Sequence, residues 1–182
     1  MLSYWEKSSF IHHDLIVVGG GIVGLSTALH FQLAHPKKKV AIIERGLFPS
    51  GASTKNAGFV CFGSISELAE NARTDSQDEL LSLVEKRYKG GLELRQLLGD
   101  QHIDYRPVGG YELDFQGDLH ERMFAFNDWL KPLFKHPVFS DVRDKIPAFG
   151  FDQTKIKGLV KICLIVSFMV LLPLLLKLTK TN

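Results

Sequence analysis

Three glycines near the start of the chain have the spacing that brings a protein backbone against a phosphate group. They are Gly19, Gly21 and Gly24, in the pattern Gly-x-Gly-x-x-Gly. The first permits a tight turn, the second lets the backbone approach a pyrophosphate without a Cβ in the way, and the third lets a helix lie close to the preceding strand. The N–H groups at the start of that helix, at Ile22 and Val23, then face the anion. The pattern predicts a dinucleotide-binding turn.

The segments around these glycines are the ones that such a turn needs. Residues 14–18, Asp-Leu-Ile-Val-Val, form a short β-branched run that predicts a buried strand. Apolar residues at helical spacing predict a helix over 22–33, which ends before Pro36. Residues 40–43, Val-Ala-Ile-Ile, predict a second buried strand. We therefore expect a strand–helix–strand unit with parallel strands and a right-handed crossover.

A carboxylate follows the second strand. Glu44 lies about 20 residues after Gly24, where an acid can accept hydrogen bonds from the hydroxyls of an adenosine ribose and would repel a 2′-phosphate. Arg45 either approaches the pyrophosphate or is solvated. Two structural interpretations stay open beside the functional one: a glycine turn that binds no ligand, and a solvated carboxylate at a strand end.

A glycine- and serine-rich loop over 46–64 is long for a connection inside one domain, which favours a binding loop. Its small residues leave backbone N–H groups open to an anionic, planar ligand. Ser53, Thr54 and Asn56 add short polar side chains as hydrogen-bond donors. The alternative is a glycine-rich surface loop without a ligand.

Residues 14–58 resemble the D-amino-acid oxidase-like family of FAD-dependent oxidoreductases, which includes glycine oxidase, sarcosine oxidase and the D-amino-acid dehydrogenases. The likeness rests on the glycine turn, the acid after the second strand, and a G-A-S…N-A-G loop at 51–53 and 56–58. It implies FAD as the cofactor, held by a Rossmann-type βαβ unit. The predicted cofactor-binding residues are Gly19, Gly21, Ile22, Val23, Gly24, Glu44, Arg45, Ser53, Thr54, Asn56, Ala57 and Gly58.

The remainder of the chain predicts an α/β protein without a further motif. Helices are expected over 66–72, 75–98 and 118–134, with a kink or break at Gly90-Gly91 in the second. Strict alternation predicts a half-exposed strand over 111–115. We expect an FAD-binding Rossmann portion at 1–100, the start of a mixed-sheet substrate domain at 101–158, and a hydrophobic C-terminal segment at 159–182.

Composition excludes several classes of function. The chain has 182 residues, 45% of them apolar, and 22 basic against 20 acidic residues, which argues against nucleic-acid binding. The two cysteines, Cys61 and Cys163, form neither a disulfide framework nor a metal pattern, so no metal site is predicted. Cys61 is expected to be a buried structural thiol rather than a covalent flavin link. No secretory signal is recognised, and the cytoplasm is the expected compartment.

The end of the chain departs from the resemblance. Residues 162–176 are apolar except for Ser167, a length that is marginal for crossing a bilayer. Three interpretations remain open: a membrane anchor through 159–177, a core segment, and non-native sequence after a frameshift or truncation of a longer gene. The last is favoured, because the change in composition coincides with the loss of the family's expected second half.

The leading functional hypothesis is an FAD-dependent oxidoreductase, or an N-terminal fragment of one, that oxidises the C–N bond of an amino acid or secondary amine by hydride transfer to the flavin. No catalytic residue is assigned, because the resemblance places substrate contacts in later parts of the family's sequence. Arg106 and Tyr111 could grip a carboxylate, but a surface or core role is favoured. The alternatives are an incomplete remnant that binds FAD weakly or not at all, and an NAD-dependent enzyme, against which the 51–58 loop argues.

Overall fold

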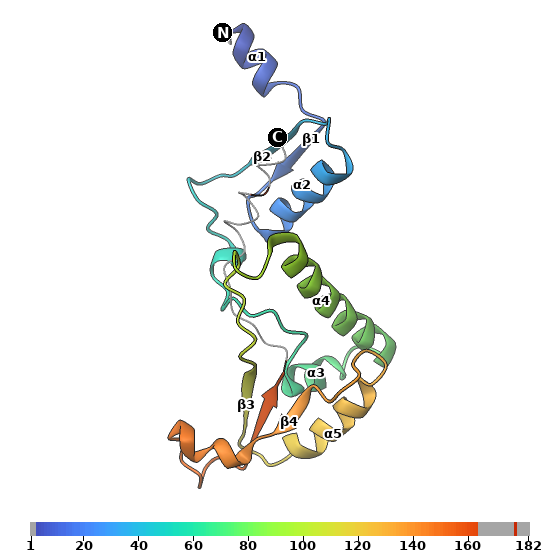
Figure 1. The fold of residues 1–182 in the computed structure, drawn as a ribbon, viewed down its shortest axis with the longest axis vertical. Helices are drawn as coiled ribbons and strands as arrows, with labels where there is room; N and C mark the ends of the chain where they lie inside the picture. Colours follow the sequence, from blue (N-terminus) through green and yellow to red (C-terminus); the bar gives the residue numbers. More distant parts are fainter. Residues whose placement is uncertain (1–2, 164–176, 178–182) are drawn as a thin grey trace. The chain divides into compact units, whose positions relative to one another are not determined.

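The structure is a computed structural model that describes residues 3–163 and residue 177. The chain divides into two compact units. The first comprises Met1–Ala57, Leu98–Asp104 and Met169–Asn182, and the second Gly58–Leu97 and Tyr105–Phe168. Figure 1 labels the α-helices and most of the strands of both units.

The first unit contains the predicted strand–helix–strand. Strand β1 (Leu15–Val18) is followed by helix α2 (Ile22–Ala34) and strand β2 (Val40–Ile43), and a short 3-10 helix, η1 (Ala52–Thr54), lies in the loop beyond (Figure 1). The two strands pair in parallel, Leu15 opposite Val40. The predicted α/β fold with parallel strands is therefore confirmed for this unit.

Only one face of this two-stranded sheet is covered by a described helix. Val17 lies under α2, whose Leu25, Ala28 and Leu29 are buried. On the opposite face Ile16 and Val18 are exposed, Val18 to 83%. The prediction that both strands are buried was therefore wrong for that face, because alternate residues of a strand point to opposite sides and α2 covers only one of them. A second apolar layer is what such a sheet normally has.

An N-terminal helix, α1 (Tyr4–Phe10), was not predicted. Its signal is in the sequence: the Ser3 hydroxyl accepts the Glu6 N–H, and the Glu6 carboxylate accepts the Ser3 N–H, which is a capping box.

The second unit combines helices with an antiparallel sheet. Its helices are α3 (Ile65–Asn71), α4 (Gln77–Leu98) and α5 (Leu119–Trp129). Its strands are β3 (Gly110–Asp114), β4 (Phe139–Asp141) and β5 (Gly158–Ile162), with the 3-10 helices η2 (Arg143–Lys145) and η3 (Pro147–Phe149) between the last two. The strand order is β3-β5-β4, and β5 pairs antiparallel with both neighbours (Figure 1).

The middle strand of this sheet is buried on both faces. Val160 and Ile162 pack into a core that contains Phe62, Phe139 and residues of all three helices. Leu159 packs on the other face with Ile146 and Ile156. The sheet thus separates a large core from a small one.

This sheet corrects the prediction for the end of the chain. The hydrophobic segment was expected to start at residue 159, yet residues 159–162 belong to β5. Apart from the half-buried Lys161, the side chains of β5 are apolar on both faces, so its sequence merges with the apolar residues that follow it. Residues 164–176, most of the proposed tail, lie outside the described residues. In the part of the chain that the structure describes, no helix has the length and hydropathy to cross a bilayer, so the membrane prediction finds no support.

Two helix predictions also differ from the structure. Helix α4 runs without a break through Gly90 and Gly91. A Cβ at Gly91 would lie 2.7 Å from the Val60 side chain, so this glycine allows close packing rather than a kink. Helix α5 ends at Trp129 instead of Phe134, and the residues beyond it turn so that Leu130 and Phe134 both enter the core.

Candidate functional site: a cleft beside the glycine turn

The three motif glycines are needed for three different physical reasons. Gly19 has a φ of +102°, which side chains other than glycine rarely adopt, and its N–H donates to the Ile43 carbonyl, 2.7 Å away. A Cβ on Gly24 would lie 2.1 Å from the Gly19 carbonyl oxygen. Gly21 has an ordinary φ of −75°, but a Cβ there would lie 3.0 Å from the Ser53 hydroxyl oxygen. The turn is therefore a cradle that side chains would fill.

Helix α2 begins at this cradle with no acid of its own. Its N-cap is Gly21, which has no side chain to accept the free N–H groups, and no acidic residue lies in the first turn. The Ile22 N–H is accepted by the Ser53 hydroxyl, so the partial positive charge of the helix N-terminus and the N–H groups that follow Ile22 are what favour an anion. The chemistry of this end of the helix thus fits a phosphate group.

Glu44 lies at the end of β2 and contacts the same turn. Its carboxylate accepts the Gly20 N–H at 2.7 Å and the Gly46 N–H at 3.3 Å. These hydrogen bonds, the one from Gly20 foremost, hold the pKa of the Glu44 carboxyl below its usual value. Glu44 is therefore an ionised acceptor at neutral pH, at the rim where a ribose hydroxyl could donate to it.

The 46–58 loop brings Ser53 to the helix, while its neighbours bond within the loop. The Ser53 hydroxyl accepts the Ile22 N–H at 3.0 Å. The Thr54 hydroxyl donates to the Gly51 carbonyl, and the Asn56 side-chain amide donates to the carbonyls of Ala52 and Ser53. The hydrogen bond between the Ile22 N–H and the Ser53 hydroxyl thus joins this loop to the start of α2.

A cleft of about 460 Å³ lies against the turn. It contains the predicted Gly19, Gly21, Glu44, Arg45 and Ser53, together with Val18, Ile43, Pro49, Ser50 and Gly51, which sequence reasoning did not select. These five residues could have been found from their position in the sequence, because each lies within a few residues of a predicted site residue. This volume lies within the usual range of small-molecule and cofactor sites.

The other predicted residues lie outside the cleft lining. Ile22 and Val23 line a shallower hollow along α2, with Ser26, Thr27 and His30. Thr54, Asn56 and Ala57 are exposed in the loop. Gly58 is the first residue of the second unit, with a φ of +74°.

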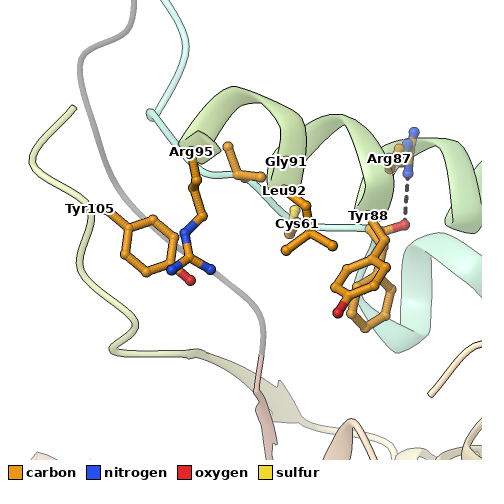
Figure 2. A pocket seen from close by; sticks show the side chains of 9 residues that line it. Cys61, Arg87, Tyr88, Gly91, Leu92, Arg95 and Tyr105 are labelled. Atoms are coloured by element: carbon orange, nitrogen blue, oxygen red, sulfur yellow. Dashed lines mark hydrogen bonds between the residues drawn. The ribbon is translucent and has the colours of Figure 1, made fainter. Parts of the chain in front are cut away.

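The second unit has a small cavity of about 90 Å³ between α4 and residues 60–62 (Figure 2). Cys61 lies in its wall as a free, half-buried thiol, and burial raises its pKa. Arg87 donates to the Phe62 carbonyl at 3.1 Å and to Glu67 at 2.8 Å, and Arg95 stacks over the Tyr105 ring. A raised pKa lowers the share of thiolate at neutral pH and with it the nucleophilicity of Cys61.

No catalytic group emerges from the remaining candidates. The Tyr111 ring packs edge-on against Phe149, at a centroid distance of 5.0 Å. The Arg106 carbonyl accepts the Val108 N–H in a local turn. Within the described ranges, no three His, Cys, Asp or Glu side chains are grouped to hold a metal ion.

A parallel βαβ unit with this glycine turn and an acid after the second strand defines a dinucleotide-binding protein of the Rossmann class. Residues 14–154 match the DAO family, described as FAD dependent oxidoreductase. The chain belongs to this family. The resemblance inferred from the sequence is therefore confirmed, and FAD is the cofactor on which the family depends.

Curated relatives match the chain over limited segments. A glycine oxidase of Geobacillus kaustophilus is 40% identical over 60 residues, which are 33% of this chain and 15% of that protein. A gamma-glutamylputrescine oxidoreductase of Escherichia coli is 33% identical over 98 residues, 53% of this chain and 22% of the relative. The matched segments thus cover less than a quarter of either relative's length.

Solved structures share the fold at lower identity. The iminodiacetate oxidase of Chelativorans sp. BNC1 aligns with a TM-score of 0.64 at 22% identity, over 92% of this chain and 45% of that one. The L-proline dehydrogenase of P. horikoshii aligns with a TM-score of 0.66 at 16% identity, over 93% of this chain and 42% of that one.

A single substitution tests the prediction that Glu44 accepts hydrogen bonds from an adenosine ribose. The Glu44→Gln variant should bind adenosine and ADP about tenfold more weakly, both to the same degree, because an ionised acceptor is replaced by a neutral amide at the ribose position. Titration calorimetry measures both affinities. Glu121→Gln, the same change on the exposed side of α5, should bind both ligands as the natural chain does. A loss confined to ADP would contradict the ribose assignment.

Proposed function

We propose that this chain forms the cofactor-binding portion of an FAD-dependent oxidoreductase that oxidises the C–N bond of an amino acid or a secondary amine. The observation that carries the proposal is the cleft, where the α2 N-terminus, the glycine cradle and the ionised Glu44 converge. Membership of the family supports FAD as the ligand. The relatives named glycine oxidase and gamma-glutamylputrescine oxidoreductase support an amine or amino-acid substrate.

Each part of the site has one task in this proposal. The turn at Gly19, Gly21 and Gly24 holds the pyrophosphate close to the helix, and Glu44 accepts hydrogen bonds from the adenosine ribose. Val18 and Ile43 supply apolar contact at the cleft wall. When bound, the flavin would supply the hydride acceptor for the carbon beside the substrate nitrogen.

The domain assignment is part of the same proposal. Residues 1–100 form the FAD-binding Rossmann portion, and 101–158 form the start of a substrate domain. The antiparallel sheet built from β3, β4 and β5 belongs to the second unit and supports a domain distinct from the βαβ unit.

The test is a titration of the purified full chain with FAD, followed by gel filtration. The expected result is flavin absorbance that elutes with the protein. Gly21→Val should abolish this co-elution, because the larger side chain meets Ser53 and occupies the pyrophosphate position. Gly90→Ala, at a helix position with open space, should retain it. Absence of bound flavin in the natural chain would overturn the proposal.

A second candidate function rests on the uncovered face of the β1–β2 sheet. Exposed Ile16, Val18 and Ile43 are unusual in a parallel sheet and would favour a remnant that binds FAD weakly or not at all. The same titration separates the candidates, since the remnant leaves flavin in the free fraction. Sequencing downstream DNA tests its origin: a second frame that resumes the family's sequence after Lys161 supports a frameshift, and its absence removes that explanation.

A further inference from the structure

The face of the β1–β2 sheet that points away from α2 is apolar. In the parallel register Val18 lies opposite Ile43, and Ile16 lies opposite Ala41. Residues directly opposite each other in a sheet point to the same side, so these four side chains share one face, which we call the open face. Val18 is 83% exposed, and Ile16 and Ile43 are each 53% exposed. The open face is therefore an apolar surface in contact with water.

The open face has two halves with different surroundings. Val18 and Ile43, at the carboxyl ends of the strands, line the cleft beside the glycine turn. Ile16 and Ala41 are not among the residues that line this cleft. A cofactor in the cleft would thus contact the first half only. The half at Ile16 and Ala41 needs a different partner, because a parallel sheet is normally buried on both faces.

The chain contains an apolar segment of suitable length. Residues 164–176 are apolar except for Ser167, and they lie outside the described residues. Of these, 169–176 belong to the same compact unit as β1 and β2. Thirteen residues span about 20 Å as a helix and more when extended, whereas a strand of four residues spans about 13 Å. The segment is long enough to lie across both strands in either conformation.

A second copy of the chain fits the open face less well. A standard interface buries about 800 Å² on each partner, and four partly exposed aliphatic side chains offer well under that area. A segment of the same chain needs no such area, because the covalent connection gives it a high effective concentration at the sheet. The small size of the open face therefore favours a partner within the chain.

We propose that residues 169–176 pack against the open face at Ile16 and Ala41 and form the second apolar layer of the β1–β2 sheet. The hydrophobic effect is non-directional, so an apolar segment of almost any order can supply such a layer. The proposal goes beyond cofactor binding and does not depend on it, since neither Ile16 nor Ala41 lines the cleft.

Photo-cross-linking of the full chain tests the contact directly. The photo-reactive residue p-benzoylphenylalanine takes the place of Ile16, and the irradiated chain is digested with trypsin. The labelled peptide 8–37 should be joined to peptide 162–177, which is flanked by the trypsin sites Lys161 and Lys177. The control has the label in place of Leu33, which is 46% exposed on α2 and lies in the same tryptic peptide. It should not be joined to 162–177, because α2 covers the opposite face.

Isotope labelling identifies the occupant of the open face. Equal parts of the natural-abundance chain and the nitrogen-15 chain are mixed before irradiation. Cross-linked peptides that carry one isotope composition only are the expected result. Pairs that mix the two compositions would assign the face to a second copy and overturn the proposal. Attachment of the label to lipid, when phosphatidylcholine vesicles are present, or to any peptide other than 162–177 would overturn it as well.

Hydrogen exchange gives a second readout that needs no label. The double variant Leu172→Asp, Leu175→Asp places two charges in the apolar segment, where they resist burial. The amides of β1 and β2 should exchange about tenfold faster in it than in the natural chain, while those of α5 in the second unit stay unchanged. Thr179→Asp with Thr181→Asp adds the same charges beyond Lys177 and should leave all these amides unchanged. Equal exchange in the two double variants would contradict the cover.

These results are distinguishable from those of the flavin titration. If the natural chain gives the 8–37 to 162–177 cross-link but binds no flavin, the cover stands and the proposed function falls. If it binds flavin but gives no such cross-link, the cover alone is overturned.

Discussion

Replacing Gly24 with alanine is expected to cost the βαβ unit about 3 kcal/mol of stability or more, and to abolish ADP binding with it. The new Cβ would lie 2.1 Å from the Gly19 carbonyl oxygen and 3.2 Å from the Val17 side chain. The first of these atoms is backbone, held by the turn, so it cannot rotate away. Overpacking costs more where no flexible side chain can yield.

Hydrogen exchange read peptide by peptide measures this effect, because the chain has two units. Peptides within residues 15–44 should lose protection in Gly24→Ala, while those of α5 and β5 keep theirs. Gly51→Ala is the control: Gly51 has a φ of −81° and open space where the methyl group of an alanine would lie, so its replacement should change exchange little. Unchanged protection in Gly24→Ala would show that the helix can shift away from the turn.

Replacing Phe62 with alanine should destabilise the second unit by about 3–5 kcal/mol. Phe62 is 2% exposed, and its ring contacts those of Phe134 and Phe139 at centroid distances of 5.2 and 5.8 Å. The loss combines the buried area of the ring with a cavity between α4, α5 and β4 that the packed core cannot close.

Urea denaturation followed by the fluorescence of Trp129, which packs against this core, measures the change. Phe59→Ala removes the same ring three positions earlier, where the side chain is 60% exposed, and should alter the free energy of unfolding by less than about 0.5 kcal/mol. Similar losses for the two variants would contradict the assignment of Phe62 to the core.

The local elements of the first unit could be predicted because their signals are short-range. The boundaries of β2, the parallel pairing with β1 and the helix that starts after Gly21 agree with the sequence-based expectation. A buried strand, a glycine turn and a helical pattern each lie within a few residues. The family assignment depended on the same short segment.

Other predictions were wrong where the role of a residue depends on a contact with a part of the chain that is distant in the sequence. Gly91 looked like a helix breaker, yet it lets Val60 pack against an unbroken α4. The apolar residues Leu130 and Phe134 continued a helical pattern, yet both enter the core from a turn beyond α5. Helical spacing and a well-placed turn can bury the same residues, so periodicity does not distinguish them.

The sequence by itself determined the glycine turn. The spacing of Gly19, Gly21 and Gly24 predicts a local backbone turn that is open to a phosphate group. Only the tertiary structure decided which side chains reach that cradle. Glu44 accepts the N–H of Gly20, 24 residues earlier in the sequence, and Ser53 accepts the N–H of Ile22, 31 residues earlier. Thr54 and Asn56 also have polar side chains, but their hydrogen bonds to Gly51, Ala52 and Ser53 lie within the loop. The sequence shows which polar side chains a loop contains. The direction in which each side chain points depends on how the loop packs against the helix.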